Sequence, residues 1–550
     1  MNPIQPFKSL LSFLLLAGFT ITLHAQDDVS KIDEILSKKY IDGEPGATAL
    51  VYRKGDIILR KGFGFANMEL KTPMKPENVF EIGSITKQFT AISILLLEER
   101  GKLNITDEIT KFIPDYPTNG KSISIHHLLN HTSGIKSYTS MPSFMEKARV
   151  DMSPKELIDV FKDEPMDFDP GEQFLYNNSG YILLGHIIEV VTGDTYENFI
   201  QKNIFDPLDM ENSYYGSHKR IIDNRAYGYQ KDGDTFVNAD YLSMTLPYAA
   251  GSLMSNVDDL LKWQLALNNY RLISKESYEK AINGSTLNNG EKIGYGYGLQ
   301  DGMTQGTKSI SHGGGIFGYT TMGVYLPEED IFVSVLSNCN CNSPSDVAVK
   351  IAAIAMGKPF PSIKDAVTLS DTEIKQWTGT YEFSDGAIRY VTVKDGKIYS
   401  QREDGQKFEI FPLAPDHFIF EDGTISYRFS MVEGKKLATF TSGETFIGQE
   451  IDKAPPPEKV AIELPSKVLH QYIGKYELQP GFVIEISVAA NQIFAQATGQ
   501  PKFEIFAEKE DHFFLKVVPA KVVFEKSEVG DVKRLTLFQG GQQMVGKKMD

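Results

Sequence analysis

The sequence has 550 residues and a mass of 61.5 kDa, which predicts about three or four domains at roughly 100 to 200 residues each. Its 41% hydrophobic and 23% charged content is that of chains that bury ordinary cores, so disorder is excluded as the main state. The 56 Lys and Arg residues against 72 Asp and Glu give a formal net charge of −16. This charge repels phosphate backbones and anionic lipid headgroups, so nucleic acid is not an expected partner.

The N-terminus has the features of a secretory signal peptide. Lys8 supplies a positive charge, residues 10–21 are apolar, and Ala25 is a small residue before a polar segment. The apolar run is shorter than the roughly 20 residues that span a bilayer, so we expect residues 1–25 to be removed rather than to anchor the chain. The sequence therefore predicts a secreted or periplasmic protein with no stable membrane insertion after signal removal.

The first long helix is predicted directly after a serine. Apolar residues recur at helical spacing over 85–96, so Ser84 lies at the helix start and Lys87 shares its face. A serine hydroxyl needs a base to become a nucleophile, and a lysine can serve if its surroundings lower its pKa from about 10.4. The same S-x-x-K spacing occurs at Ser133 and Ser277, and a plain helix cap is the ordinary alternative for such a serine.

Two later segments carry further candidate site residues. Tyr176 and Asn178 lie in a predicted loop before a helix, where functional side chains are often presented. His312 is followed by glycines at 313–315, just before a hairpin predicted over 319–336. Glycines in a strand indicate that something approaches the backbone closely, as a substrate would.

Two residue pairs could suggest metal or redox chemistry. His127 and His131 have the i, i+4 spacing of zinc-binding helices, but Leu128 occupies the place of the general-base glutamate and no third ligand is evident. Cys339 and Cys341 would lie about 6.5 Å apart on an extended segment, near the upper limit for a disulfide. We therefore expect a plain loop pair of cysteines, no metal site and no cofactor.

The C-terminal part of the chain repeats itself. Beyond prolines at 359 and 361, short strand-like stretches alternate with turn residues. Three segments recur at one offset of 95 residues: 379–382 as 474–477, 407–411 as 502–506, and 416–418 as 511–513. A period this long predicts two complete small domains, each an antiparallel sheet closed or nearly closed into a barrel.

The ordered set Ser84-x-x-Lys87, Tyr176-x-Asn178 and His312-x-Gly314 resembles the three motifs of the serine β-lactamase and penicillin-binding protein superfamily, in its class C β-lactamase-like branch. Segments at 127–134, 170–180, 249–255 and 295–299 are similar to that branch too, so the resemblance covers most of 28–357. It implies an α+β fold, in which an antiparallel sheet is flanked by helices and joined by a helical subdomain.

The prolines, the repeat and the extent of the resemblance divide the chain into consecutive segments. The catalytic region is the β-lactamase-like domain, and the two repeats are the barrel-like domains. We expect a signal peptide at 1–25, the β-lactamase-like domain at 28–357, a linker at 358–370, the first β-domain at 371–452, a Pro-rich linker at 453–465 and the second β-domain at 466–550.

The resemblance implies covalent catalysis through an acyl-enzyme. Ser84 would attack a carbonyl carbon, and Lys87 and Tyr176 would share the general-base and general-acid roles. Asn178 would hold both Lys87 and the substrate amide.

The third motif would bind the substrate. His312 would take the place of the usual lysine, followed by Gly314, and the backbone N–H groups of Ser84 and Gly315 would form an oxyanion hole. A histidine here is expected to make the charge of the site depend on pH near neutrality and to weaken the anchor for a β-lactam carboxylate.

The leading hypothesis is an exported serine hydrolase that acts on an amide or ester of a small molecule or peptide. D-amino-acid peptides of the peptidoglycan type, β-lactams and small esters are the candidate substrates. The alternative is a non-catalytic protein that keeps the fold and binds a cell-wall or other ligand through its two barrels. The barrels could also narrow the active-site cleft.

Overall fold

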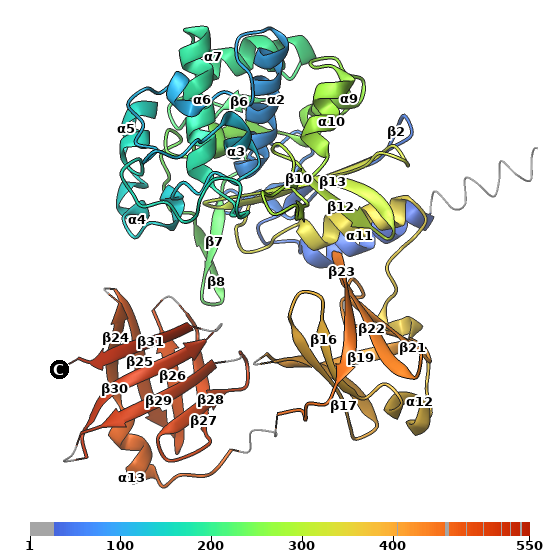
Figure 1. Cartoon of the computed structure of the whole chain (residues 1–550), viewed down its shortest axis with the longest axis vertical. Coiled ribbons are helices and arrows are strands. Elements are labelled where there is room, and N and C mark those ends of the chain that lie inside the picture. Colours follow the sequence, from blue (N-terminus) through green and yellow to red (C-terminus); the bar gives the residue numbers. More distant parts are fainter. Residues whose placement is uncertain are drawn as a thin grey trace, which may run out of the picture. The chain divides into compact units, whose positions relative to one another are not determined.

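The computed structural model describes residues 27–403, 405–456, 461–479, 481–498, 500–518, 520–527, 530–539 and 542–549. The predicted signal peptide, 1–25, lies outside the described residues. The chain forms two compact units (Figure 1). The first comprises the described residues up to Lys231 together with Phe236–Phe360, and the second comprises Asp232–Thr235 and the described residues from Pro361 onward.

The first unit is built on an antiparallel sheet whose strand order, within the described part of the chain, is β12-β13-β14-β15-β1-β2. The inner strand β1 pairs along its whole length with β15, so the start and the end of this unit meet inside the sheet. Its strands are β1 (Ala47–Arg53), β2 (Asp56–Phe63), β12 (Gln300–Thr304), β13 (Thr307–Ile316), β14 (Tyr319–Leu326) and β15 (Ile331–Ser337).

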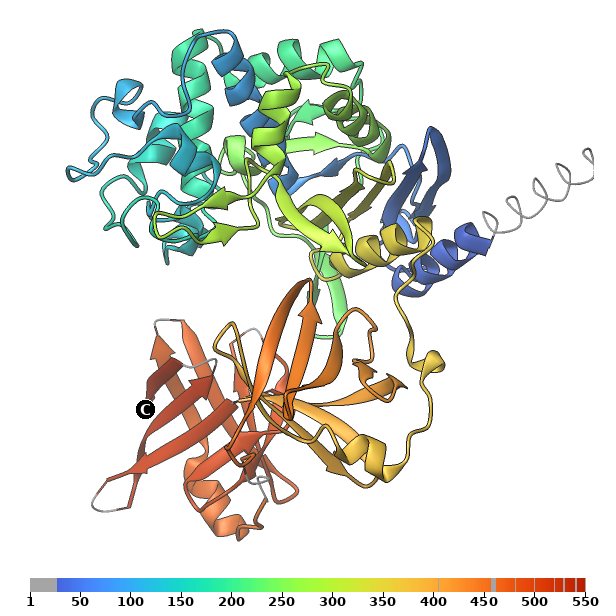
Figure 2. The ribbon, with the colours of Figure 1, turned by 45° about the vertical axis from the view of Figure 1, so that its right-hand side comes forward.

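Helices cover both faces of this sheet, which is why its central strands are almost continuously apolar. On one face, a helix at 27–39 and α11 (Ser345–Ala355) pack against Ala49 and Val333 (Figure 2). On the other face, Leu50 and Leu336 belong to a larger core shared with the remaining helices. The alternation of side chains along each strand thus divides the unit into two cores.

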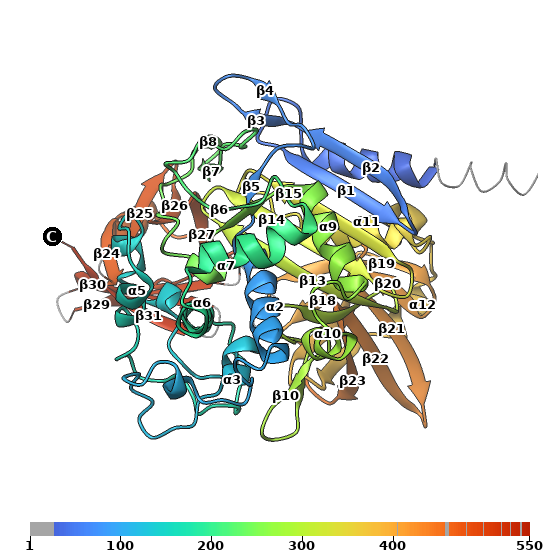
Figure 3. The same cartoon turned by 90° about the horizontal axis from the view of Figure 1, so that it is seen from above.

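The helical layer positions the candidate site. Helix α2 (Thr86–Glu99) is buried from its first residue to Leu97 and lies beside α6 (Asn178–Thr192) (Figure 3). Its buried polar residues Lys87, Gln88 and Thr90 make hydrogen bonds inside the unit. The other helices are α3 (Ile125–Leu129), α4 (Phe144–Lys147), α5 (Pro154–Asp159), α7 (Tyr196–Ile200), α8 (Tyr248–Gly251), α9 (Val257–Asn268) and α10 (Lys275–Ile282).

Short strands and turns complete the first unit. The strand β9 (Leu253–Ser255) lies between β5 (Phe80–Glu81) and β6 (Tyr214–Tyr215). Two-stranded ladders are formed by β3 (Phe65–Asn67) with β4 (Thr72–Pro73), β7 (Tyr229–Asp232) with β8 (Thr235–Asn238), and β10 (Ser285–Thr286) with β11 (Lys292–Ile293).

The second unit contains two closed antiparallel barrels, which confirms the fold class predicted from the repeat. In each barrel every strand pairs with the next one along the chain, and the first pairs with the last. The first barrel comprises β16 (Gly379–Phe383), β17 (Ile388–Lys394), β18 (Lys397–Arg402), β19 (Lys407–Ala414), β20 (His417–Ile419), β21 (Ser426–Val432), β22 (Lys435–Ser442) and β23 (Glu444–Ile451). The second comprises β24 (Gly474–Gln479), β25 (Phe482–Ala489), β26 (Gln492–Ala497), β27 (Lys502–Ala507), β28 (His512–Leu515), β29 (Ala520–Lys526), β30 (Val532–Gln539) and β31 (Gln542–Lys548).

The repeat preserves the way each barrel is closed at one end. Short helices, α12 (Asp371–Lys375) and α13 (Ser466–Leu469), precede the first strands. In the first barrel Tyr381 donates a hydrogen bond from its hydroxyl to the Trp377 carbonyl at 2.8 Å; in the second, Tyr476 makes the same bond to the Tyr472 carbonyl. Trp377 and Tyr472 stack on phenylalanines of their own barrels. A buried aromatic plug therefore fills this end of each barrel.

The cysteine prediction is wrong. Cys339 and Cys341 form a disulfide with their α carbons 5.1 Å apart, not the 6.5 Å expected of an extended segment. The chain turns over residues 340–341 as it leaves β15, and this turn brings the two side chains together. No helix of the described residues is long and apolar enough to cross a membrane.

The disulfide predicts the thiol content of the protein. The sequence has two cysteines and both are bonded, so unfolded, unreduced protein should react with no equivalent of a thiol reagent. After reduction it should react with two. Two reactive thiols before reduction would contradict the bond, and the Cys339→Ser, Cys341→Ser double variant is the control for background reaction.

Candidate active site

The candidate nucleophile lies on a tight turn that touches the sheet. β5 leads into a single helical turn, Gly83–Ile85, which holds Ser84 and continues into α2. Gly83 has a φ of +51°, and a Cβ at this position would lie 2.9 Å from the backbone nitrogen of Gly315. Only glycine therefore lets this turn approach β13 so closely. The approach brings Ser84 beside Gly315, as the predicted oxyanion hole requires.

Lys87 is fully buried in the site, with an exposed fraction of 0%. Its Nζ lies 3.1 Å from Ser84 Oγ, 2.8 Å from Asn178 Oδ1 and 2.8 Å from the carbonyl oxygen of Ala250. None of these three partners is a carboxylate. Burial lowers the pKa of Lys87 well below its usual value, because the charged form would lose its water without gaining an anion. An uncharged Lys87 has a lone pair with which to take the proton of Ser84.

Tyr176 lies close to the same amine, and its hydroxyl is free to act on a substrate. Lys87 Nζ is 4.9 Å from the centre of the Tyr176 ring. The Tyr176 hydroxyl is buried and makes no hydrogen bond of normal geometry among the residues that the structure describes, although Ser84 is near enough to affect its pKa. Burial raises the pKa of Tyr176, opposed in part by Ser84, so the phenol holds its proton at neutral pH. The resting site therefore contains a neutral amine and a neutral phenol.

Asn178 is held in place from two sides. It is the first residue of α6, after Asn177, whose side chain caps the helix by accepting a hydrogen bond from Gly180 N. Its Oδ1 accepts from Lys87, and its Nδ2 donates to Thr139 Oγ1 at 2.9 Å. The amide thus orients the amine of Lys87 toward Ser84.

His312 lies on β13 and is only 3% exposed. Its Nδ1 is 2.6 Å from the carbonyl oxygen of Gly313, and its Nε2 is 2.9 Å from the hydroxyl of Tyr295. A carbonyl can only accept, so Nδ1 donates and Nε2 accepts from Tyr295. Burial and then the nearby Lys87 lower the pKa of His312 to about 4. The expectation that its charge changes near neutrality is therefore wrong, because desolvation keeps the ring neutral.

The glycines after His312 leave one edge of β13 open. β12 pairs with β13 only as far as Ser311, so residues 312–316 have a strand partner on the β14 side alone. A Cβ at Gly314 would lie 2.0 Å from the carbonyl oxygen of Ile82, whereas one at Gly315 would meet no atom within 4 Å. An unpaired strand edge beside Ser84 can receive an extended substrate backbone.

His131 is a site residue whose role the sequence analysis missed. Its Nδ1 accepts from Asn177 N at 3.1 Å, and its carbonyl accepts from Leu175 N at 3.0 Å. These two bonds bracket Tyr176, whose ring lies 4.3 Å from the imidazole. His131 adopts a φ of +62°, which is unusual for a residue with a side chain. A strained backbone at a buried contact with a candidate catalytic tyrosine indicates a positioning role.

The two histidines of the zinc-like spacing serve separate contacts. His127 accepts a hydrogen bond at Nδ1 from Ser124 N and so caps the start of α3. The ring of His131 packs instead against Tyr176 and Tyr295. The turn after α3 is the sequence signal that could have indicated the role of His131. A helix that ends against a loop places one of its last residues in contact with that loop.

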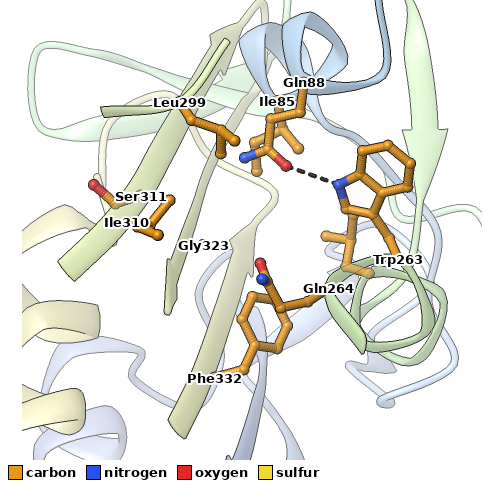
Figure 4. A pocket seen from close by; sticks show the side chains of 10 residues that line it. Ile85, Gln88, Trp263, Gln264, Leu299, Ile310, Ser311, Gly323 and Phe332 are labelled. Atoms are coloured by element: carbon orange, nitrogen blue, oxygen red, sulfur yellow. Dashed lines mark hydrogen bonds between the residues drawn. The ribbon is translucent and has the colours of Figure 1, made fainter. Parts of the chain in front are cut away.

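A small pocket lies on the other side of the Ser84 turn, between α2, α9 and the sheet (Figure 4). Trp263 Nε1 donates to Gln88 Oε1 at 2.9 Å at its rim. None of Ser84, Lys87 and Tyr176 lines it. It is therefore separate from the candidate catalytic groups. Its lining residues are Ile85, Gln88, Leu260, Trp263, Gln264, Leu299, Ile310, Ser311, Gly323 and Phe332.

Comparison with known proteins identifies the family. Residues 33–355 match the Beta-lactamase family, and residues 458–548 match a domain of unknown function, DUF3471. Because the first match covers more than half of the chain, the protein belongs to the β-lactamase family and with it to the serine β-lactamase and penicillin-binding protein superfamily. Its relatives therefore include serine hydrolases with this fold.

Individual relatives share long stretches with this chain. Penicillin-binding protein 4* of Bacillus subtilis (strain 168) is 32% identical over 409 residues, which are 70% of this chain and 90% of the relative. A D-aminopeptidase of Gluconobacter oxydans (strain 621H) is 25% identical over 343 residues, 61% of this chain and 64% of the relative.

Solved structures show the same fold. The octameric penicillin-binding protein homologue from Pyrococcus abyssi is 29% identical and matches 77% of this chain and 99% of that one, with a TM-score of 0.55. A D-stereospecific amidohydrolase from Streptomyces sp. is 26% identical and matches 58% of this chain and 97% of that one, with a TM-score of 0.52.

A first prediction concerns His131. The His131→Leu variant should lower kcat roughly 10- to 100-fold with a smaller change in KM, because Tyr176 loses the acceptor that fixes its loop. The His131→Asn variant should keep kcat within a few-fold of wild type, since an amide oxygen can replace Nδ1 and asparagine tolerates positive φ. Steady-state kinetics of both variants is the measurement.

The matched control is His127→Leu, which removes a helix cap made by another histidine of the same segment. It should cost about 1 kcal/mol of unfolding free energy and leave kcat unchanged. Equal losses of kcat in the His127→Leu and His131→Leu variants, or no rescue by asparagine, would show that His131 acts only on stability.

A second prediction concerns stability against pH. The pKa of His312 is about 4 in the folded protein and 6.5 ordinarily, so the unfolded chain binds more protons between these values. The free energy of unfolding should fall as pH drops from about 6.5 to 4, on the order of 3 kcal/mol for this group. Urea unfolding at several pH values should show a shallower fall for His312→Gln, and parallel curves would refute the assignment.

Proposed function

We propose that the protein is an exported serine hydrolase that forms an acyl-enzyme on Ser84 and cleaves amide or ester bonds of substrates with no carboxylate on the leaving side. D-amino-acid amides and short D-peptides with a blocked C-terminus are the proposed class. The observation that carries the proposal is the buried amine of Lys87, held without an anion 3.1 Å from Ser84 Oγ. The relatives named as a D-aminopeptidase and a D-stereospecific amidohydrolase support the choice of D-amino-acid substrates.

In acylation, Lys87 takes the proton of Ser84 as Oγ bonds to the substrate carbonyl carbon. The carbonyl oxygen gains negative charge, which the backbone N–H groups of Ser84 and Gly315 bind. The neutral phenol of Tyr176 then gives its proton to the leaving group as the bond to that group breaks, and recovers a proton from Lys87. The raised pKa of Tyr176 favours this role over that of a phenolate base.

Deacylation returns the site to its starting state. Water attacks the acyl carbon and passes a proton to Lys87. The bond between the acyl carbon and Ser84 Oγ breaks, and Ser84 regains a proton from Lys87. Asn178 keeps the amine aligned in both steps, because its Oδ1 accepts from Lys87 throughout.

The charge of the site supports the substrate class. Lys87, His131 and His312 all have lowered pKa values, chiefly because each is buried. Both ring nitrogens of His312 are already used by Gly313 and Tyr295. A substrate carboxylate next to the scissile bond would lose its water and find no cation in exchange, which costs free energy. β-Lactams and peptides with a free C-terminal carboxylate are therefore disfavoured.

Export is part of the same proposal. The features of residues 1–25 support it, and so does the Cys339–Cys341 disulfide, because disulfides persist mainly in oxidising compartments. Intact-mass analysis of the protein from a bacterial culture should show a chain that starts at Gln26. A cytoplasmic chain that retains its first residues would contradict export and leave the chemistry unaffected.

The decisive experiment compares D-alanyl-D-alanine with its C-terminal amide, which differ only in the leaving-side carboxylate. The amide should have a kcat/KM about tenfold higher or more. His312→Lys supplies a cation at this position and should narrow or reverse the preference. A preference for the free acid by the wild type, or a covalent penicillin adduct, would refute the substrate class.

Ser84→Ala is the matched control for the reaction itself. It should lower the turnover of both compounds by a factor of about 10³ or more, since the nucleophile is lost. Unchanged turnover in this variant would refute the acyl-enzyme. A wild type that turns over neither these compounds nor small esters would favour the non-catalytic alternative.

A further inference from the structure

One end of the first barrel carries aromatic side chains around an arginine. The inside-facing positions follow from the alternation along each strand: Phe408 shares a face with the core residue Ile410, and Tyr427 bonds inside the barrel to Ser400 at 2.8 Å. We call this group the aromatic end. It consists of Phe383, Arg389, Phe408, Phe420, Tyr427, Phe440 and Phe446. The rings of Phe383, Phe408, Phe420, Tyr427 and Phe440 contact one another, and Phe446 lies opposite Phe440 on the next strand.

The aromatic end is the open end of the barrel. The opposite end is filled by Trp377, which stacks on Phe429 and donates to the Pro415 carbonyl. Phe408 faces the interior, yet 49% of it is exposed. An inside-facing ring is exposed to this extent only when no plug covers it, so a ligand can reach Phe408 and the partly buried rings of Phe420 and Phe446 from this side.

Arg389 has hydrogen-bonding capacity left over. Its guanidinium carbon lies 3.9 Å from the centre of the Phe440 ring and 5.4 Å from that of Phe383. Its side chain is 12% exposed, and its ion pair with Asp385 is long at 3.9 Å. Its Nε is buried with no partner among the described residues. Buried charges are normally paired, so the Nε donor and part of the guanidinium charge remain available to an anion.

The second barrel shows that the fold does not need these groups. At the offset of 95 residues, Arg389 corresponds to Ile484, and Ser400 corresponds to Ala495. Aliphatic residues replace most of the aromatic residues there, yet the second barrel closes with the same strand order. The counterparts of Phe383, Phe408, Phe420, Tyr427 and Phe440 are Leu478, Phe503, Leu515, Val522 and Leu535.

We propose that the aromatic end of the first barrel binds a small organic anion with a flat aromatic body. The guanidinium of Arg389 takes the anionic group, and the rings of Phe408, Phe420 and Phe446 take the body. This binding site is independent of Ser84 and of the proposed reaction.

The test uses the full-length protein and two fluorescent probes with similar aromatic bodies: anilinonaphthalene sulfonate, which is an anion, and N-phenylnaphthylamine, which is neutral. Wild type should bind the sulfonate. Arg389→Met should weaken that binding about tenfold or more and change the affinity for the neutral probe by less than about threefold. Ile484→Met, the matched change in the second barrel, should leave both affinities unchanged.

Three results would overturn the proposal: no binding of the sulfonate by wild type, equal binding by Arg389→Met, or an equal loss in the Ile484→Met variant. Equal binding by Arg389→Met would mean that the arginine only fills the barrel end. If Arg389→Met does not fold, as judged by circular dichroism, Phe408→Ala replaces it. This change removes an exposed ring and should weaken the binding of both probes. Unchanged affinities would refute the proposed site.

Discussion

The burial of the Lys87 amine without a carboxylate is the constraint on which the rest of the catalytic unit depends. The uncharged amine needs two oxygen acceptors and the serine hydroxyl within reach. The turn before α2 supplies the hydroxyl of Ser84, the start of α6 supplies Asn178 Oδ1, and α8 supplies the carbonyl oxygen of Ala250. Helix α2 is buried from Thr86 to Leu97, so the helical layer keeps water away from this amine. The packing of the helical layer and the proposed reactivity of Ser84 therefore depend on each other.

The same desolvation sets the character of the whole site. Burial lowers the pKa of Lys87, His131 and His312; Lys87 lowers the pKa of both histidines further, and His312 also lowers that of His131. A site of this kind gains its reactivity from neutral groups and has no fixed cation to attract an anion. The first barrel differs from this site, because the Arg389 guanidinium there lies beside aromatic rings and a distant carboxylate.

The motif order in the sequence predicted the α+β fold and the residues that the structure brings together around Ser84, and the repeat at an offset of 95 residues predicted the two barrels. It could not predict the charge of His312, because that depends on burial and on Tyr295, which is remote from the motif. The bracket that His131 forms around Tyr176 also depends on tertiary contacts between two loops. The disulfide was missed because the turn after β15 has no clear signal in the run from Asn338 to Asn342.

The pairing of β1 with β15 has a consequence for how the chain acquires its structure. The Ser337 hydroxyl donates to the Gly46 carbonyl across 291 positions of sequence, so the central sheet cannot form until nearly all of the unit has been synthesised. In each barrel most ladders join neighbouring strands, which are local contacts and form quickly. The central sheet is therefore expected to close more slowly than either barrel.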